Sequence, residues 1–240
     1  MAEGVGPPPG AGTLTPARAG GESVRDGRAM DVAFGLVGKD FALLVTDTNA
    51  GRSVVVMKEA EDKIKELDKH KLLAVTGEPG DSTQFSEFVA ANMELYRFRN
   101  NGLRLSTKAA ANFMRGELAT ALRKGPYQTN LLVAGWDADA GPSLYYLDYL
   151  ATLHKQNTAS FGYGGMFTSS LMDKWWRPNL ELDDAMAIVD KCLAEVAMRL
   201  TVAPSQYLVK IVDKDGARLL AKKGQPAAAA FPEAGVVESA

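Results

Sequence analysis

The 240-residue chain has a single cysteine, Cys192, and only two histidines, His70 and His154. One cysteine excludes a disulfide within the chain and is typical of proteins from reducing compartments. Two histidines without cysteine partners show no zinc-ligand spacing, and they leave a His-dependent catalytic triad without an anchor. We therefore expect no metal site and no cofactor, and we interpret both histidines as surface or structural residues.

The chain also lacks an excess of charge of either sign and any long apolar run. Its 27 basic and 29 acidic residues give a formal net charge of −2, which does not favour binding to nucleic acid or to an anionic membrane. No apolar run approaches the roughly 20 residues that span a bilayer, and the N-terminus has no apolar stretch of the signal-peptide kind. We therefore expect a soluble intracellular protein without nucleic-acid or membrane partners.

Both ends of the chain have few apolar residues to bury. Residues 1–29 are rich in Pro, Gly and Ala, and residues 224–240 have a similar composition. Ordering such segments would cost conformational entropy without a compensating gain from burial, so we expect disordered tails. The range 30–223 is predicted to form one domain that needs no disulfide or metal to be stable.

Within this domain, two kinds of periodicity alternate. β-type runs predict strands at 32–37, 41–45, 53–56, 63–67, 71–76, 130–137, 141–148 and 206–213. Helical spacing of apolar residues predicts helices at about 79–101, 106–124, 165–175 and 182–200. Asp81 or Ser82 is the candidate N-cap of the first helix, and Ser106 is the candidate N-cap of the second.

The order of these elements is strands, two helices, strands, two helices and a final strand, without βαβα alternation. Two antiparallel sheets packed face to face, with a helix pair on each outer face, would bury every apolar stripe. The predicted fold is therefore α+β, a four-layer αββα sandwich.

A glycine-rich bend at 162–165 precedes the third predicted helix. Backbone N–H groups at such a bend could hold an anion, but the lysine of a P-loop and the acidic residue of a dinucleotide site are both missing. The alternative interpretation is a tight bend, where glycine allows two backbones to approach closely.

Two aromatic doublets and the cysteine are candidates for packing or contact roles. Adjacent strand residues face opposite ways, so one of Tyr145 and Tyr146 should lie in a core and the other against a second layer or a partner. Trp175 and Trp176 end a short helix, which suits either a subunit contact or core filling. Cys192 falls on the apolar stripe of the last helix and is interpreted as a small buried hydrophobic residue.

Asp47 follows the first predicted hairpin, and Lys63 begins a later strand sixteen residues further on. A carboxylate and a lysine placed at strand ends can form a structural ion pair or support an active site. The residues alone leave both interpretations open.

Beyond these patterns, the chain from about 30 to 216 resembles the beta subunits of the 20S proteasome. It is most similar to the non-catalytic beta type-2 class, which occupies the fourth position of the beta ring. The runs that carry the resemblance are 77–88, 95–100, 109–113, 130–137, 141–150, 154–164, 171–173 and 191–195. The resemblance implies the N-terminal-nucleophile hydrolase fold, which is itself an αββα sandwich.

Active members of that family use a threonine at the start of the first strand, whose hydroxyl attacks the peptide carbonyl and whose free α-amino group acts as the base. Residues 28–32 of this chain contain no threonine. The one Gly-Thr pair, Gly12-Thr13, lies in the Pro/Gly-rich tail and is followed by Leu14-Thr15-Pro16 instead of a strand. We therefore expect that Thr13 is not a nucleophile.

The remaining positions of the family's site are only partly retained. Asp47 and Lys63 match the aspartate and lysine that flank the nucleophile, whereas Gly165 stands where a serine is expected. Leu200 and Ala203 stand where an aspartate and a second serine are expected. The resemblance therefore implies no catalytic residue, and it implies that Asp47 and Lys63 form a vestigial ion pair that holds two strands together.

The function implied by the resemblance is that of a structural beta subunit. It would contribute to assembly of the beta ring and to the wall of the proteolytic chamber in ubiquitin- and ATP-dependent protein degradation. Its partners would be other alpha and beta subunits in stacked seven-membered rings, in the cytoplasm and nucleus. Two alternatives remain open, an active threonine hydrolase processed at another site and a free-standing binding domain that uses the bend at 162–165.

Overall fold

The computed structural model describes residues 31–52 and 55–224. The predicted tails therefore lie outside the described residues, except that Gly224 ends the last strand. The elements are, in chain order, β1 (Val32–Val37), β2 (Phe41–Asp47), β3 (Ala50–Arg52), β4 (Val55–Lys58), β5 (Ile64–Asp68), β6 (Lys71–Gly77), α1 (Pro79–Arg99), α2 (Thr107–Ala121), β7 (Thr129–Asp137), β8 (Gly141–Leu147), β9 (Leu153–Gln156), β10 (Thr158–Phe161), α3 (Gly162–Trp175), α4 (Leu182–Arg199), β11 (Gln206–Asp213) and β12 (Gly216–Gly224).

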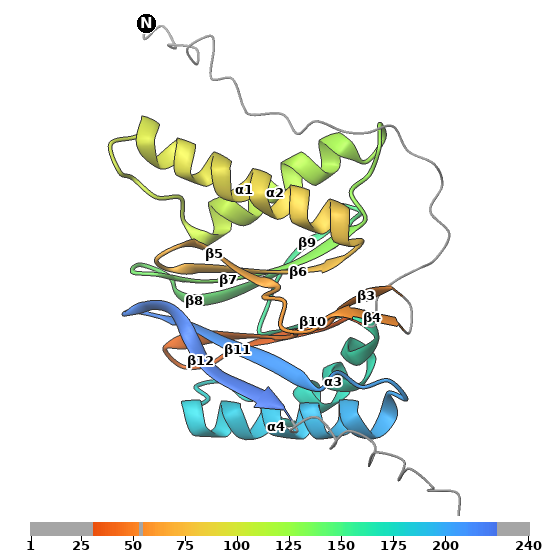
Figure 1. The fold of residues 1–240 in the computed structure, drawn as a ribbon. Helices are drawn as coiled ribbons and strands as arrows, with labels where there is room; N and C mark the ends of the chain where they lie inside the picture. The colour runs from red at the N-terminus through yellow and green to blue at the C-terminus, as the bar shows by residue number, and fades with distance from the viewer. Residues whose placement is uncertain (1–30, 53–54, 225–240) are drawn as a thin grey trace, which may run out of the picture.

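These elements form four layers (Figure 1). One five-stranded sheet has the order β10-β1-β2-β11-β12, the other has the order β5-β6-β7-β8-β9, and all their pairings are antiparallel. Helices α1 and α2 cover the outer face of the second sheet, and α3 and α4 cover the outer face of the first. The predicted four-layer αββα sandwich is confirmed.

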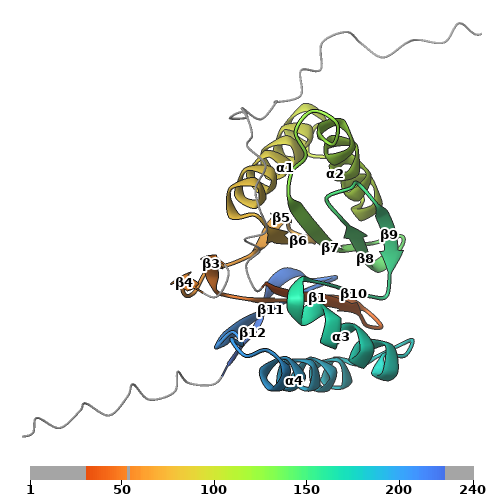
Figure 2. The ribbon, with the colours of Figure 1, turned by 90° about the vertical axis from the view of Figure 1, so that its right-hand side faces the viewer.

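The short ribbon β3–β4 stands apart from both sheets (Figure 2). Its strand β4 is exposed along its whole length, and β3 pairs with no strand other than β4 among the described residues. The ribbon replaces the single strand predicted at 53–56, of which residues 53–54 lie outside the described part of the chain.

Three apolar cores hold the layers together. Two lie between a helix pair and a sheet, and the third lies between the two sheets. Five of the twelve buried residues in the third core are alanines: Ala33, Ala42, Ala74, Ala134 and Ala159. Small side chains at these positions let the sheets approach closely, as face-to-face sheets pack about 10 Å apart.

The aromatic doublets divide between these cores and the surface. Tyr145 is buried in the α1/α2 core, whereas Tyr146 faces the other sheet and stacks on Phe161 with ring centroids 4.3 Å apart. Trp176 packs on the α3/α4 core and donates from Nε1 to the Val37 carbonyl at 2.7 Å. Trp175 is 41% exposed. Core filling is therefore confirmed for one tryptophan, and a subunit contact remains a prediction for the other.

Several details of the prediction were wrong, and the strands β9 and β10 were not among those predicted. The N-cap of α1 is Glu78, whose carboxylate accepts from the Asp81 N–H at 2.8 Å, because Pro79 already occupies the first turn. The last strand, β12, was missed because it is an edge strand with one buried residue and no clear apolar alternation. The predicted N-cap Ser106 and the buried Cys192 are confirmed.

Candidate functional site

The candidate site lies where the two sheets meet at the start of β1, and three charged residues form it. Asp31 immediately precedes β1, Asp47 is the last residue of β2, and Lys63 immediately precedes β5. The Lys63 Nζ lies 2.7 Å from Asp31 Oδ1 and 2.8 Å from Asp47 Oδ2. A single ammonium group is thus shared by two carboxylates that belong to the opposite sheet.

Backbone groups complete the coordination of both carboxylates. Asp47 accepts from the N–H of Val32 at 2.8 Å and from the N–H of Asn49 at 3.0 Å. The Oδ2 atom of Asp31 accepts from the N–H of Gly77, at the end of β6, at 3.1 Å. The side chains of Asp47, Asp31 and Lys63 are only 1%, 9% and 10% exposed. The cluster is therefore a closed, hydrogen-bonded connection between the sheets.

Burial governs the ionisation of this cluster. It raises the pKa of Asp47, an effect that the positive charge of Lys63 opposes and that the negative charge of Asp31 increases. Burial by itself would lower the pKa of Lys63, but the two carboxylates outweigh it and the pKa of Lys63 is raised. The ammonium group is thereby held in its protonated form and cannot easily serve as a base.

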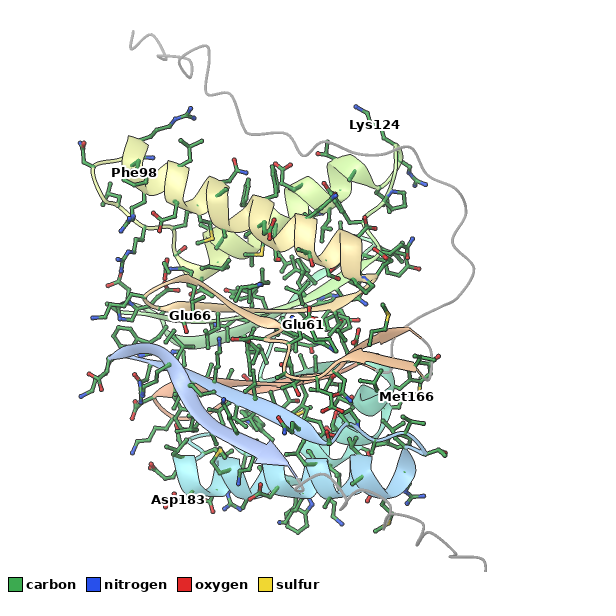
Figure 3. All side chains as sticks on the ribbon, in the orientation of Figure 1. Glu61, Glu66, Phe98, Lys124, Met166 and Asp183 are labelled. Carbon is green, nitrogen blue, oxygen red and sulfur yellow. The ribbon has the colours of Figure 1, made fainter. Side chains whose placement is uncertain are left out.

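A cleft opens beside this cluster, between β3, the end of β6 and the start of α1. Its cavity volume is about 70 Å³. Figure 3 shows Glu61, one of its lining residues, on the segment that crosses from β4 to β5. The lining residues are Asp31, Asn49, Ala50, Gly51, Glu61, Asp62, Lys63, Lys65, Val75, Thr76, Gly77, Pro79, Ser82, Thr83 and Ser86.

The glycine-rich bend lies against the start of β1, and it forms the first turn of α3 instead of preceding the helix. Gly162 has a φ of +78°, and a Cβ there would lie 2.0 Å from the Asp31 carbonyl oxygen. A Cβ at Gly164 would lie 2.6 Å from the Val32 side chain. Gly162 is required because two backbones meet there, and Gly164 is required because the Val32 side chain packs against it, which supports the tight-bend interpretation over the anion cradle.

The three positions where the family resemblance predicts polar side chains carry none. Gly165 offers only its carbonyl, which accepts from the hydroxyls of Ser160 at 3.2 Å and Ser169 at 2.7 Å. Leu200 caps the C-terminus of α4 and packs on the α3/α4 core. Ala203 follows in the turn that leads to β11. Neither residue can supply a carboxylate or a hydroxyl.

Asp31 is the site residue that sequence reasoning missed. From the sequence, Asp31 was considered only as part of the segment 28–32, which contains no threonine. The regular spacing of the charged residues could have indicated it. Asp31 and Asp47 are sixteen residues apart, and so are Asp47 and Lys63. The structure shows that Asp31 occupies the start of the first strand, where the resemblance places the nucleophile of active members. Thr13 lies outside the described residues.

The histidines take no part in this site. His70 lies in the turn before β6, with Nε2 3.2 Å from the Lys214 carbonyl oxygen, and His154 lies on β9. In the part of the chain that the structure describes, no group of three His, Cys, Asp or Glu residues is placed to hold a metal ion. No helix within residues 31–52 and 55–224 is long and apolar enough to cross a membrane.

Comparison with known proteins agrees with the resemblance. The family profile described as "Proteasome subunit" matches residues 31–212. The proteasome subunit beta type-2 of Oryza sativa subsp. japonica is 53% identical over 211 residues, which cover 87% of this chain and 99% of that protein. The proteasome subunit beta type-2-B of Arabidopsis thaliana is 56% identical over 189 residues, or 79% of this chain and 94% of that protein.

A fungal relative extends the same pattern. The probable proteasome subunit beta type-4 of Schizosaccharomyces pombe is 40% identical over 191 residues, which cover 79% of this chain and 98% of that protein. The matched range begins with Asp31 and ends within β11, so it includes the cluster, the cleft and the glycine-rich bend. The chain therefore belongs to the proteasome subunit family and, within it, to the beta type-2 class.

Proposed function

We propose that this chain is a non-catalytic subunit of the 20S core particle, which contributes to assembly of the beta ring and to the wall of the proteolytic chamber. The observation that carries the proposal is Asp31, which stands at the start of β1 with its carboxylate 2.7 Å from the Lys63 ammonium. An aspartate has no hydroxyl, so the hydroxyl nucleophile that active members use is not encoded at this point.

The rest of the site supports the same conclusion. Lys63 already has two carboxylate partners, so it is not available to lower the pKa of an attacking hydroxyl. An apolar leucine at position 200 cannot relay a proton or orient an ammonium group. According to this proposal, Asp31, Asp47 and Lys63 have a structural role, and they stabilise the junction between the sheets.

The proposed partners are other alpha and beta subunits in stacked seven-membered rings, and the proposed setting is ubiquitin- and ATP-dependent degradation in the cytoplasm and nucleus. The match to beta type-2 subunits over 79% to 87% of the chain supports this assignment. Purification of the tagged chain from its own cells, followed by a census of bound subunits by mass spectrometry, tests it. We expect alpha and beta subunits in equal amounts, and elution of the chain alone would contradict the proposal.

A second experiment tests the absence of catalysis. An electrophilic peptide that captures N-terminal threonine should modify other subunits of the purified assembly and leave this chain unmodified. A Thr13→Ala variant serves as the control and should label identically. An adduct on Thr13, or on any new N-terminal residue of this chain, would show that it is an active hydrolase. Gly165→Ser should restore a hydroxyl without producing peptide hydrolysis, because the nucleophile is still missing.

A further inference from the structure

The chain contains one Asn-Gly pair, Asn101-Gly102, in the connection between α1 and α2. An asparagine loses its side-chain amide when the nitrogen of the following peptide bond attacks its Cγ. A side chain on the following residue hinders this attack, and glycine has none. Asn101 and Gly102 are both exposed, and no heavy atom beyond its chain neighbours lies within 4 Å of where a Cβ of Gly102 would stand. Water and base therefore reach the pair.

The fold holds the attacking nitrogen in a helix cap. α1 ends at Arg99, and Asn101 follows its C-cap residue with a left-handed φ of +53°. Gly102 has a φ of +86°, and its N–H donates to the Arg97 carbonyl at 2.9 Å. This is the arrangement of a Schellman motif, in which the chain turns away from the helix beyond its last turn. The Gly102 nitrogen can attack Cγ only after this hydrogen bond has opened.

The last turn of α1 has little buried surface to hold it closed. Figure 3 shows Phe98 in this turn, where its side chain is 73% exposed. Asn100 donates from Nδ2 to the Tyr96 carbonyl at 2.7 Å, in a hydrogen bond that is also exposed. Helix ends of this kind open at a free energy far below that of global unfolding. The cap therefore slows the attack at Asn101 but does not prevent it.

From these observations we propose that Asn101 is a site of spontaneous deamidation, and that opening of the last turn of α1 sets its rate. In the opened turn, the Gly102 nitrogen loses its proton to solvent base and forms a bond to Cγ of Asn101, and the side-chain nitrogen leaves as ammonia. Water then opens the resulting succinimide ring. Cleavage of the bond from nitrogen to Cγ gives aspartate, and cleavage of the bond from nitrogen to the backbone carbonyl carbon gives isoaspartate. One water is consumed for each ammonia released.

The two products change the cap in different ways. Aspartate can keep the left-handed conformation, but it places a negative charge at the C-terminus of a helix, where the carbonyl groups already carry negative partial charge. Isoaspartate adds a methylene group to the main chain, so the hydrogen bond from Gly102 to Arg97 loses its register. Both products loosen the last turn of α1. The modification is independent of the non-catalytic role proposed above.

Incubation of the full-length chain at mildly alkaline pH, in the assembly it forms, tests the proposal. Asn179 is a control within the same chain, because it is also exposed and has a φ of +59° but is followed by Leu180. Peptide mass spectrometry, with a methyltransferase specific for isoaspartate, measures both products at each position. We expect both products to accumulate at Asn101, faster as the pH rises, while Asn179 stays unmodified. No conversion of Asn101, or equal conversion of the two asparagines, would overturn the proposal.

Urea unfolding removes the cap and leaves the sequence unchanged. Asn101 should convert about tenfold faster in the unfolded full-length chain than in the folded assembly at the same pH, because the Gly102 N–H is then no longer held. Asn179 serves as the reference for any effect of urea on the reaction itself. The same rate for Asn101 in both states would show that the cap has no influence, and would overturn the control by α1.

Substitutions in the last turn test the control by the helix end directly. Phe98→Gly favours opening of this turn, whereas Phe98→Ala removes the same ring and retains a high helix propensity. Asn101 should convert about threefold faster in Phe98→Gly than in Phe98→Ala. Equal rates in the two variants would contradict the control by α1. The comparison with Asn179 needs no substitution, so it decides the proposal even if both variants fail to fold.

Discussion

Two buried lysines lie at the junction of the sheets, and they differ in the exposure of their partners. Lys63 and Lys210 have nearly equal side-chain exposure, 10% and 9%. The partners of Lys63, Asp31 and Asp47, are themselves buried. Lys210 lies 2.7 Å from Asp62 and 3.8 Å from Glu66, whose side chains are 48% and 53% exposed. One lysine is enclosed with its counter-ions, and the other extends from the core to a solvated rim.

The comparison shows that burial of the counter-ion determines how much the loss of an ion pair lowers the free energy of unfolding. Lys210 also donates to the Ile64 carbonyl at 2.7 Å, and its carboxylate partners can be hydrated when it is removed. The side chains of Asp31 and Asp47 are only 9% and 1% exposed, so they have much less access to water. Removing one partner of an enclosed pair leaves a charge without compensation, whereas a partner at the rim is screened by solvent.

The largest expected effect is that of Lys63→Met. The substitution retains most of the apolar side chain but leaves two buried carboxylates together, which should lower the free energy of unfolding by about 3–5 kcal/mol. Urea unfolding of the purified chain measures the change. A loss no greater than that of Lys210→Met would remove the distinction between the two lysines.

The pH dependence of the stability of Lys63→Met also tests whether burial of the carboxylates controls the loss. Burial and the negative charge of Asp31 raise the pKa of Asp47, and without Lys63 nothing of positive charge opposes them, so the folded state binds more protons than the unfolded state. The stability of Lys63→Met should therefore increase as the pH falls from 7 towards 5. A stability curve parallel to that of the unmodified chain would contradict this account.

Asp47→Asn should have the next largest effect, about 2–3 kcal/mol. The amide keeps one oxygen for the N–H of Val32 but directs an NH₂ group towards the Lys63 ammonium or the Asn49 N–H. Asp31 still neutralises Lys63, which limits the loss. Urea unfolding again measures it, and Asp62→Asn is the matched control at the rim, expected to lose less.

Lys210→Met should cost only about 0–1 kcal/mol. Methionine retains the buried apolar part of the side chain, and Asp62 and Glu66 become hydrated. The remaining loss is that of the hydrogen bond to the Ile64 carbonyl. A cost approaching that of Lys63→Met would show that exposure of the partner does not control the energetics.

The smallest effect is expected in the pair between Asp213 and Arg218, in which the side chain of the cation is itself 46% exposed. The hydrogen bond from Arg218 holds the pKa of Asp213 below its ordinary value of 3.8. This contribution is present above pH 3.8 and is lost as the pH falls through the lowered pKa. Asp213→Asn should cost about 0.5 kcal/mol or less near pH 7 because solvent screens the pair, and the difference should vanish near pH 2.

Most of the architecture could be predicted because each core-facing element carries its own periodicity. The two helix pairs and the central strands were expected, and β11 was predicted with its observed bounds, Gln206–Asp213. β12 could not be found, since it is an edge strand with one buried residue and no clear apolar alternation. The N-cap at Glu78 was missed because a glutamate is an uncommon cap.

The site was only partly predictable. Asp47 and Lys63 were singled out from their strand-end positions and the family spacing, but nothing local distinguishes Asp31 from any other acidic residue before a strand. Its role depends on Lys63, which is 32 residues away and lies at the edge of the other sheet. Likewise, the sequence offered no reason to pack Trp176 on the core and leave Trp175 exposed, because the Val37 carbonyl that accepts from Trp176 comes from β1.

The sequence by itself determined the αββα order, the absence of a threonine before the first strand, and the family, because these depend on residue types and on local periodicity. Only the tertiary structure decided that Asp31 closes the site with Lys63 and Asp47, and that a cleft with unpartnered polar groups remains beside them. The physical reason is that hydrogen bonds and desolvation act between atoms a few ångströms apart, and sheet packing alone brings residues 31, 47 and 63 within that distance.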